Sequence, residues 1–119
     1  MHILTVPGRK TGRRYSTPVS LVMDEGRLWL VAPYGEREWV KNARAAGEVE
    51  LTRARKTTSH RVEEAGPEEA APVLREYLRT RRIVKPFFEA APDAPLEAFA
   101  AEASRHPVFR LVDQRSVAR

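Results

Sequence analysis

Residues 7–14 read Pro7-Gly8-Arg9-Lys10-Thr11-Gly12-Arg13-Arg14, so four cationic side chains stand beside two glycines. An apolar run, residues 3–6, precedes this stretch and an alternating run, residues 15–23, follows it, which predicts a basic turn between two β-strands. Glycine lets the backbone approach a ligand closely, and successive N–H groups can form a nest for phosphate or carboxylate oxygens. Lysine would add a point charge and arginine two-point contacts. A solvated hairpin loop is an equally good interpretation of the turn alone, because the turn matches neither a Walker loop nor a dinucleotide fingerprint.

The chain after this turn has the pattern of an antiparallel β-barrel. Residues 15–23 alternate as one half-buried strand, and Pro18, which has no N–H to donate, places part of it at an edge or a bulge. A turn signal at residues 24–26 and an apolar run at residues 28–32 complete a hairpin, and the density of that run predicts a strand covered on both faces. Further strands are expected near residues 48–51, 58–63 and 107–112, and helices over residues 36–46, 67–84 and 96–104. This order predicts a mainly β, α+β fold with one short inserted helix and C-terminal helices.

A second basic stripe lies on the helix predicted over residues 36–46. Arg37, Lys41 and Arg44 have the spacing of one helix face, while Trp39, Ala43 and Ala46 fall on another. The stripe either faces the basic turn or is the solvated side of an ordinary amphipathic helix, and the spacing by itself favours the solvated side.

The composition is that of a soluble globular protein. At 119 residues, with 42% hydrophobic and 31% charged residues, the chain has the size of one domain, residues 1–119. No apolar run approaches the roughly 20 residues of a membrane-spanning helix, and the N-terminus lacks a signal-peptide pattern, so we expect a cytoplasmic protein, with peripheral contact with a membrane left open. The absence of cysteine excludes disulfides, a thiolate nucleophile and cysteine zinc sites. The formal charge of +5 favours an anionic partner, which could be nucleic acid, a membrane surface or a phosphorylated small molecule.

The familiar catalytic and nucleic-acid-binding patterns are missing. His2, His60 and His106 are dispersed without a carboxylate motif beside them, so we expect structural roles for them and no metal site. No Gly-x-Ser-x-Gly elbow points to acyl transfer. The cations of residues 53–56 and 79–85 are not interleaved with aromatic side chains that could stack on bases, so no nucleic acid is expected as a partner.

Several of these motifs occur together in one known family. The stretches 4–13, Thr17-Pro18-Val19, 24–26, Val31-Ala32 and 39–45, in this order, resemble the deazaflavin-dependent nitroreductase family of F-420H2-dependent quinone and nitro reductases. The resemblance implies a split β-barrel of the FMN-binding, flavin-reductase-like type. It also implies that the chain binds coenzyme F-420, an 8-hydroxy-5-deazaflavin whose tail carries a phosphate and several glutamates.

The resemblance further implies which residues bind this cofactor. The turn receives the phosphate and the acidic tail, two strand segments line the ring, and the Trp-x-x-Asn-x-Arg helix borders the same groove. These positions are Gly8, Arg9, Lys10, Thr11, Gly12, Arg13 and Arg14 for the tail, Thr17, Pro18, Ala32 and Pro33 for the ring, and Trp39, Lys41, Asn42 and Arg44 on the helix. Pro33 stands where the family often has a hydroxyl side chain, so the expected proton donor is Tyr34 or Tyr15.

The resulting hypothesis is an F-420H2-dependent reductase that transfers hydride from C5 of the reduced deazaflavin to a hydrophobic quinone, nitroaromatic or enone acceptor. The cofactor carries the difficult step, which fits a chain without an evident acid–base dyad. The alternatives are an FMN-binding, flavin-reductase-like protein, a non-catalytic cofactor-binding module, and a basic module that binds nucleic acid. The apolar strand at residues 28–32 also predicts a homodimer.

Overall fold

The computed structural model describes residues 1–117 and contains one curled β-sheet with helices at two places. The strands are β1 (His2–Pro7), β2 (Arg14–Val19), β3 (Leu21–Asp24), β4 (Arg27–Val31), β5 (Glu48–Arg53), β6 (Lys56–Glu64) and β7 (Val108–Ser116). The helices are α1 (Glu38–Ala46), α2 (Pro67–Thr80) and α3 (Leu96–Glu102), with 3₁₀ turns η1 (Arg82–Phe87) and η2 (Ala103–Arg105). Neighbouring strands all pair antiparallel, in the order β2-β1-β5-β6-β7-β4-β3. The predicted mainly β class is confirmed.

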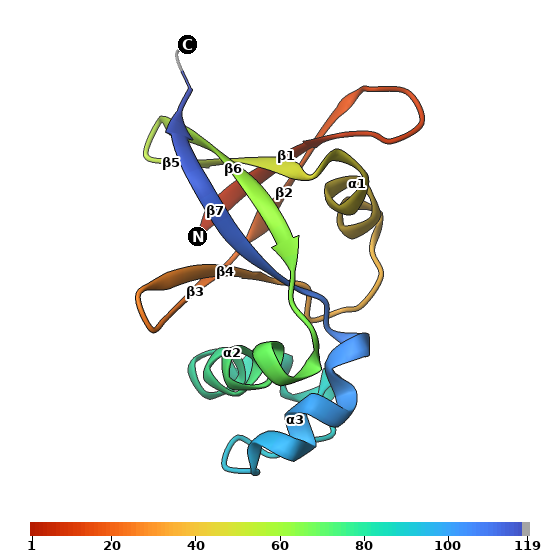
Figure 1. Cartoon of the computed structure of the whole chain (residues 1–119), viewed down its shortest axis with the longest axis vertical. Coiled ribbons are helices and arrows are strands. Elements are labelled where there is room, and N and C mark those ends of the chain that lie inside the picture. The colour runs from red at the N-terminus through yellow and green to blue at the C-terminus, as the bar shows by residue number, and fades with distance from the viewer. Residues whose placement is uncertain (118–119) are drawn as a thin grey trace.

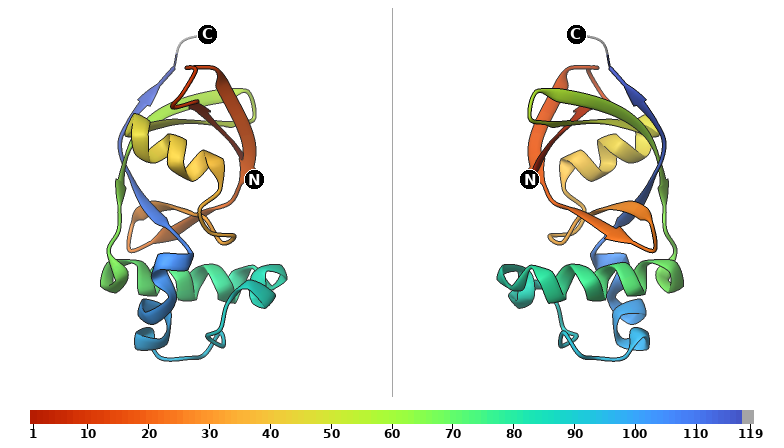
Figure 2. Two further views of the ribbon diagram at one scale, coloured as in Figure 1. Left: turned by 90° about the vertical axis from the view of Figure 1, so that its right-hand side faces the viewer. Right: turned by 90° about the vertical axis from the view of Figure 1, so that its left-hand side faces the viewer.

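The single strand predicted over residues 15–23 is wrong. The chain breaks at Ser20 into β2, which pairs with β1, and β3, which pairs with β4. These two strands are the opposite edges of the sheet, so one bend carries the chain from one edge to the other and the sheet has to curl. Pro18 lies in the edge strand β2, as predicted for a residue that has no N–H to donate. The curl and the inserted α1 are visible in Figures 1 and 2.

Two apolar clusters hold the fold together. One fills the concave side of the sheet, where inward-facing strand side chains meet Val40 and Ala43 of α1. The other lies between the β3–β4 end of the sheet and helices α2 and α3, which lie together at one end of the molecule (Figure 1). Strand β4 belongs to both, because Leu30 faces the concave side while Trp29 and Val31 face α2. The predicted two-sided burial of this strand is therefore confirmed, and each fully buried aliphatic side chain contributes about 1.5–3 kcal/mol.

The helices differ from the prediction mainly at their ends. Helix α1 ends at Gly47 as predicted, with φ of 71° and its N–H donating to Ala43 O at 2.8 Å. Helix α2 stops at Thr80 rather than near residue 84, and a 3₁₀ turn follows. Pro86 lies within this 3₁₀ turn, and its ring and missing N–H disfavour an α-helix that continues past it. Strand β7 continues to Ser116, four residues beyond the predicted 107–112, because its polar end pairs with β6.

Candidate cofactor site

The basic turn between β1 and β2 is a compact loop that depends on its glycines. Gly8 N–H donates to Arg13 O at 2.6 Å, and Gly12 N–H donates to Gly8 O at 2.8 Å. Gly12 has a φ of 76°, which disfavours any other residue, and a Cβ on Gly8 would lie 2.7 Å from the Tyr15 ring. The predicted turn is confirmed in position and in its need for glycine.

Asn42 joins this turn to helix α1. Its side chain is 5% exposed, and its Oδ1 accepts hydrogen bonds from the Arg9 backbone N–H at 3.0 Å and from Arg9 Nη1 at 2.8 Å. The asparagine and the turn, which lie 33 residues apart, therefore form one unit. Asn42 fixes the backbone of the turn, a physical role that the motif alone does not reveal.

A cavity of about 310 Å³ opens where the turn meets α1, and we call it the turn cavity. Its lining residues are Gly8, Arg9, Lys10, Thr11, Tyr15, Glu38, Trp39 and Asn42. Glu38 Oε1 lies 3.2 Å from Arg9 Nη1 and its Oε2 lies 3.7 Å from Lys41 Nζ. The hydrogen bond from Arg9 lowers the pKa of the Glu38 carboxyl below its usual value. Lys10 has no ion pair within the described chain, so it is available to an anion.

A larger cavity of about 580 Å³, the apolar cavity, shares Trp39 with the turn cavity. Its lining comes from the N-terminus, β2, the end of β4, the following loop, the start of α1 and the α2–η1 junction. The lining residues are Met1, Thr17, Pro18, Val19, Ser20, Val31, Pro33, Tyr34, Arg37, Trp39, Tyr77, Arg81, Ile83 and Val84. Trp39 is half-buried and lines both cavities. A flat ring in the apolar cavity could therefore be continuous with an anionic tail in the turn cavity.

The structure brings together most of the predicted positions but not all. Ala32 is buried in the apolar cluster on the concave side of the sheet and lines neither cavity. Gly12 and Arg13 lie on the turn but outside the cavity lining. Arg14 pairs with Glu50, and Arg44 is held by Glu36 and Glu64, all with N–O distances of 2.5–2.9 Å. The second basic stripe is thus divided, since Arg37 lines the apolar cavity, Lys41 pairs with Glu38, and Arg44 points to neither cavity.

The two predicted proton donors are also separated. Tyr15 lines the turn cavity and Tyr34 the apolar cavity. Tyr34 is 47% exposed, and its ring meets that of Phe87 edge-on at a centroid distance of 4.7 Å. Tyr77 and Arg81 also line the apolar cavity, although nothing in the sequence analysis singled them out as site residues.

A buried Glu102–His106 pair supports one wall of the apolar cavity. His106 Nε2 lies 2.8 Å from Glu102 Oε1, and Nδ1 donates to Pro33 O at 2.9 Å, with the ring stacked on Phe88. Burial raises the pKa of Glu102, but hydrogen bonds from His106 and from the N–H groups of Ala90 and Glu89 outweigh it, so this pKa lies below its usual value. The contacts of His106 give it the structural role that was expected. The expectation that no carboxylate accompanies this histidine is wrong, because Glu102 precedes it by four residues and contacts its ring.

The described residues show two further features. Within residues 1–117, no group of three or more histidine, aspartate or glutamate side chains is arranged to hold a metal ion. None of the helices in that part of the chain has the length and apolar character needed to cross a lipid bilayer.

Comparison with known proteins identifies a family and similar folds. A family model described as F-420H(2)-dependent quinone reductase matches residues 1–85. Among solved structures, the chain is similar to protein Atu2129 of unknown function from Agrobacterium tumefaciens, with 14% identity, a TM-score of 0.69 and 98% of this chain covered, although it spans only 50% of that protein's length. It is also similar to an F-420-H2 dependent reductase, FDR-A, with 18% identity, a TM-score of 0.63, and coverage of 92% and 91%.

A third similar structure is described as a domain-swapped dimer, with 17% identity, a TM-score of 0.62, and coverage of 92% of this chain and 78% of that one. No curated protein matches the chain. At these identities the solved structures support the fold alone, and the predicted split barrel is confirmed.

Proposed function

Because the chain belongs to the F-420H(2)-dependent quinone reductase family, we propose that it transfers hydride from reduced coenzyme F-420 to a hydrophobic quinone, nitroaromatic or enone acceptor. Membership in the family confirms the resemblance and the enzyme class predicted from the sequence. The acceptor, the residues that hold the cofactor and the preference for F-420 over FMN belong to the proposal.

The observation that carries this proposal is that Trp39 lines both cavities. A deazaflavin has a flat ring, which needs an apolar slot, and a long anionic tail, which needs cations at a distance from that slot. The apolar cavity meets the first need with Pro18, Val31 and Pro33, and the turn cavity meets the second with Arg9 and Lys10. The volumes lie within the range of about 300–1,000 Å³ that is usual for ligand sites. The residues present therefore fit the cofactor.

The side chains have distinct tasks in this arrangement. The side chain of Lys10 would hold the phosphate and the acidic tail, while the side chain of Arg9, fixed by Asn42, would add a directed contact. Thr17 and Pro18 of β2 and Pro33 after β4 would orient the ring and exclude water from one side. The bound cofactor supplies hydride chemistry, so binding, orientation and shielding are what the chain has to provide.

The chain's exposed edges also support a homodimer as part of this proposal. Strands β2 and β3 are sheet edges with unpaired backbone groups, and Met23 on β3 is 62% exposed. Light scattering on the purified protein tests this point, because a dimer would have twice the 13.5 kDa of one chain and a monomer of 13.5 kDa would contradict it.

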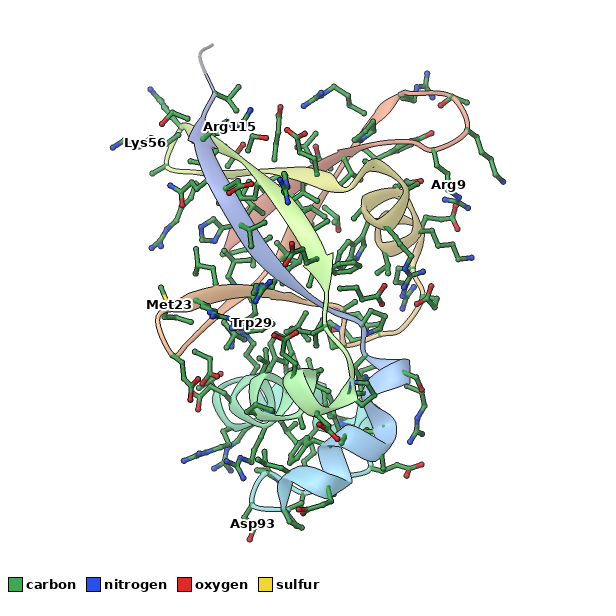
Figure 3. The ribbon with its side chains drawn as sticks, in the orientation of Figure 1. Arg9, Met23, Trp29, Lys56, Asp93 and Arg115 are labelled. Carbon is green, nitrogen blue, oxygen red and sulfur yellow. The ribbon has the colours of Figure 1, made fainter. Side chains whose placement is uncertain are left out.

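Turnover is tested by following the anaerobic reoxidation of F-420H2 with 1,4-naphthoquinone, nitrobenzene and cyclohexenone as acceptors. We expect turnover with at least one acceptor and none when FMNH2 replaces F-420H2. The Lys10→Gln variant should raise the KM for F-420H2 about fivefold or more, because a charge-assisted contact is lost. Lys56→Gln is the matched control, since Lys56 lies at the β5–β6 turn on the other side of the molecule from Arg9 (Figure 3). Turnover with FMNH2 but not F-420H2 would contradict the proposal.

A further inference from the structure

Tyr77 presents an unused hydroxyl to the apolar cavity. The residue lies on α2, is 5% exposed and lines the cavity. Within the described chain the Tyr77 hydroxyl makes no hydrogen bond. Two side-chain atoms there are both fully buried and without a hydrogen-bond partner, Trp29 Nε1 and Arg110 Nε, and the Tyr77 oxygen is not one of them. The oxygen is therefore not sealed in the core, and the space it meets is the cavity. A hydroxyl with no protein partner that meets the cavity can donate a hydrogen bond to a ligand there.

Arg81 stands beside this phenol in a fixed position. Its Nη1 donates to Thr80 Oγ1 and its Nη2 to Leu21 O, both at 2.7 Å. Its Cζ lies 4.7 Å from the centroid of the Tyr77 ring, and the side chain lines the same cavity. Burial raises the pKa of Tyr77, the charge of Arg81 opposes this rise, and nearby Tyr34 adds to it, so the phenol stays protonated at neutral pH. A proton donor and a cation that can stabilise its anion thus occur together.

We propose that Tyr77 donates a hydrogen bond and then a proton to the oxygen of a quinone or enone acceptor in the apolar cavity, and that Arg81 is the positioning residue that holds the phenol and stabilises its anion. This inference rests on the proposed function. Tyr34 is the competing donor, but it is half-exposed at the cavity wall, whereas Tyr15 belongs to the other cavity.

The proton and electron balance is complete in this step. A quinone becomes a hydroquinone by gaining one hydride, which reduced F-420 supplies, and one proton. The O–H bond of Tyr77 breaks as the new O–H bond of the acceptor forms, and water then returns a proton to the phenolate. No other oxidant or reductant is needed.

The first test needs no cofactor. The chain has three tyrosines, so an absorbance titration of the free protein with pH resolves few transitions. We expect the transition at highest pH to be absent from Tyr77→Phe and present in Tyr34→Phe. If Tyr77→Phe removes a transition at or below the ordinary value of about 10, the phenol is not shielded as the inference requires.

The second test compares turnover and binding. Tyr77→Phe should lower kcat with 1,4-naphthoquinone about 100-fold, as expected for loss of a general acid, and leave the Kd for F-420 within about twofold. In the wild-type protein kcat should fall at alkaline pH, and Tyr77→Phe should lack this limb. Arg81→Gln should lower kcat about tenfold and Arg81→Lys should restore part of it, since removing a neighbouring charge weakens the anion stabilisation. Arg79→Gln, an exposed change on the same helix, is the matched control.

The outcomes separate the two proposals. If the wild type turns over and Tyr77→Phe retains kcat within about threefold, or if Tyr34→Phe alone carries the loss, this inference fails and the proposed function stands. If the wild type shows no turnover with F-420H2, the proposed function fails and this inference falls with it. Circular dichroism monitors folding of the variants. If Tyr77→Phe does not fold, the kcat values of Arg81→Gln and Arg81→Lys decide the test, and an unchanged kcat in both overturns the inference.

Discussion

Replacing Glu102 by glutamine perturbs the buried pair that holds one wall of the apolar cavity. Glu102 is 2% exposed, and its carboxylate accepts hydrogen bonds from Ala90 N–H at 2.8 Å, Glu89 N–H at 3.1 Å and His106 Nε2 at 2.8 Å. A glutamine has only one accepting oxygen, so its NH2 group would face a donor and leave buried N–H groups without partners. At about 1–3 kcal/mol for each such group, the variant should lose about 2–4 kcal/mol of unfolding free energy.

Thermal unfolding followed by circular dichroism measures this loss. For a chain of this length about 1 kcal/mol corresponds to about 4 °C, so the midpoint at pH 7 should fall by about 8–16 °C. Glu97→Gln, an exposed change on the same helix, should leave the midpoint within about 1 °C. A fall of less than about 3 °C for Glu102→Gln would refute the reasoning about the buried donors.

The pH dependence of this difference has a defined sign. The folded-state pKa of Glu102 lies below its ordinary value of 4.5, so its ionisation stabilises the fold above pH 4.5. That contribution is lost as the pH falls below 4.5 and through the folded-state pKa. The difference in unfolding midpoint between the wild type and Glu102→Gln should therefore become smaller in this acid range. A difference of constant size down to pH 3 would contradict the lowered folded-state pKa of Glu102.

Three further variants address the turn cavity and its surroundings. Glu38→Gln should tighten F-420 binding about two- to fivefold in a fluorescence titration, less at high salt, because it removes a carboxylate that competes for Arg9; weaker binding would contradict this. Gly8→Ala should lower the free energy of unfolding in urea by about 1–3 kcal/mol, because the new Cβ would lie 3.2 Å from the carbonyl oxygen of Arg13 and against the ring of Tyr15. An unchanged urea midpoint would show that the turn relaxes freely. Arg44→Gln should lower the unfolding midpoint by about 1–4 °C, because it removes the ion pairs with Glu36 and Glu64. F-420 affinity should stay within about twofold, because this side chain lines neither cavity. A large loss of affinity would show that Arg44 belongs to the cofactor site.

The fold was predictable from the sequence where local patterns coincide with pairing. The β3–β4 hairpin and the β5–β6 pairing follow from alternation between turn residues, and Gly47 marked the end of α1. The break at Ser20 was not predictable, because the alternation of residues 15–23 continues across it while the pairing partner changes. The extension of β7 was hidden as well, since residues 113–116 are polar and their strand conformation depends on pairing with β6.

Some residues of the candidate site were predictable from local motifs, and others depend on tertiary packing. The turn and the Trp39–Asn42 segment are local motifs, so their meeting at one cavity could be anticipated. Tyr77 and Arg81 come from a helix that is distant in sequence, and only the packing of α2 against the β3–β4 end of the sheet places them in the apolar cavity. Arg14 and Arg44 fit the motif, but acidic side chains from other strands and loops hold them outside both cavities.

The two cavities that Trp39 lines are proposed to hold, together, one ligand with a flat ring and a long anionic tail. The most direct measurement is a fluorescence titration of the purified protein with F-420 beside FMN, at low and at moderate salt. We expect tight F-420 binding that weakens with salt, and weak FMN binding, because FMN has one phosphate and no glutamate tail to reach the turn cavity. Equal or tighter binding of FMN, or F-420 binding unaffected by salt, would contradict this central claim.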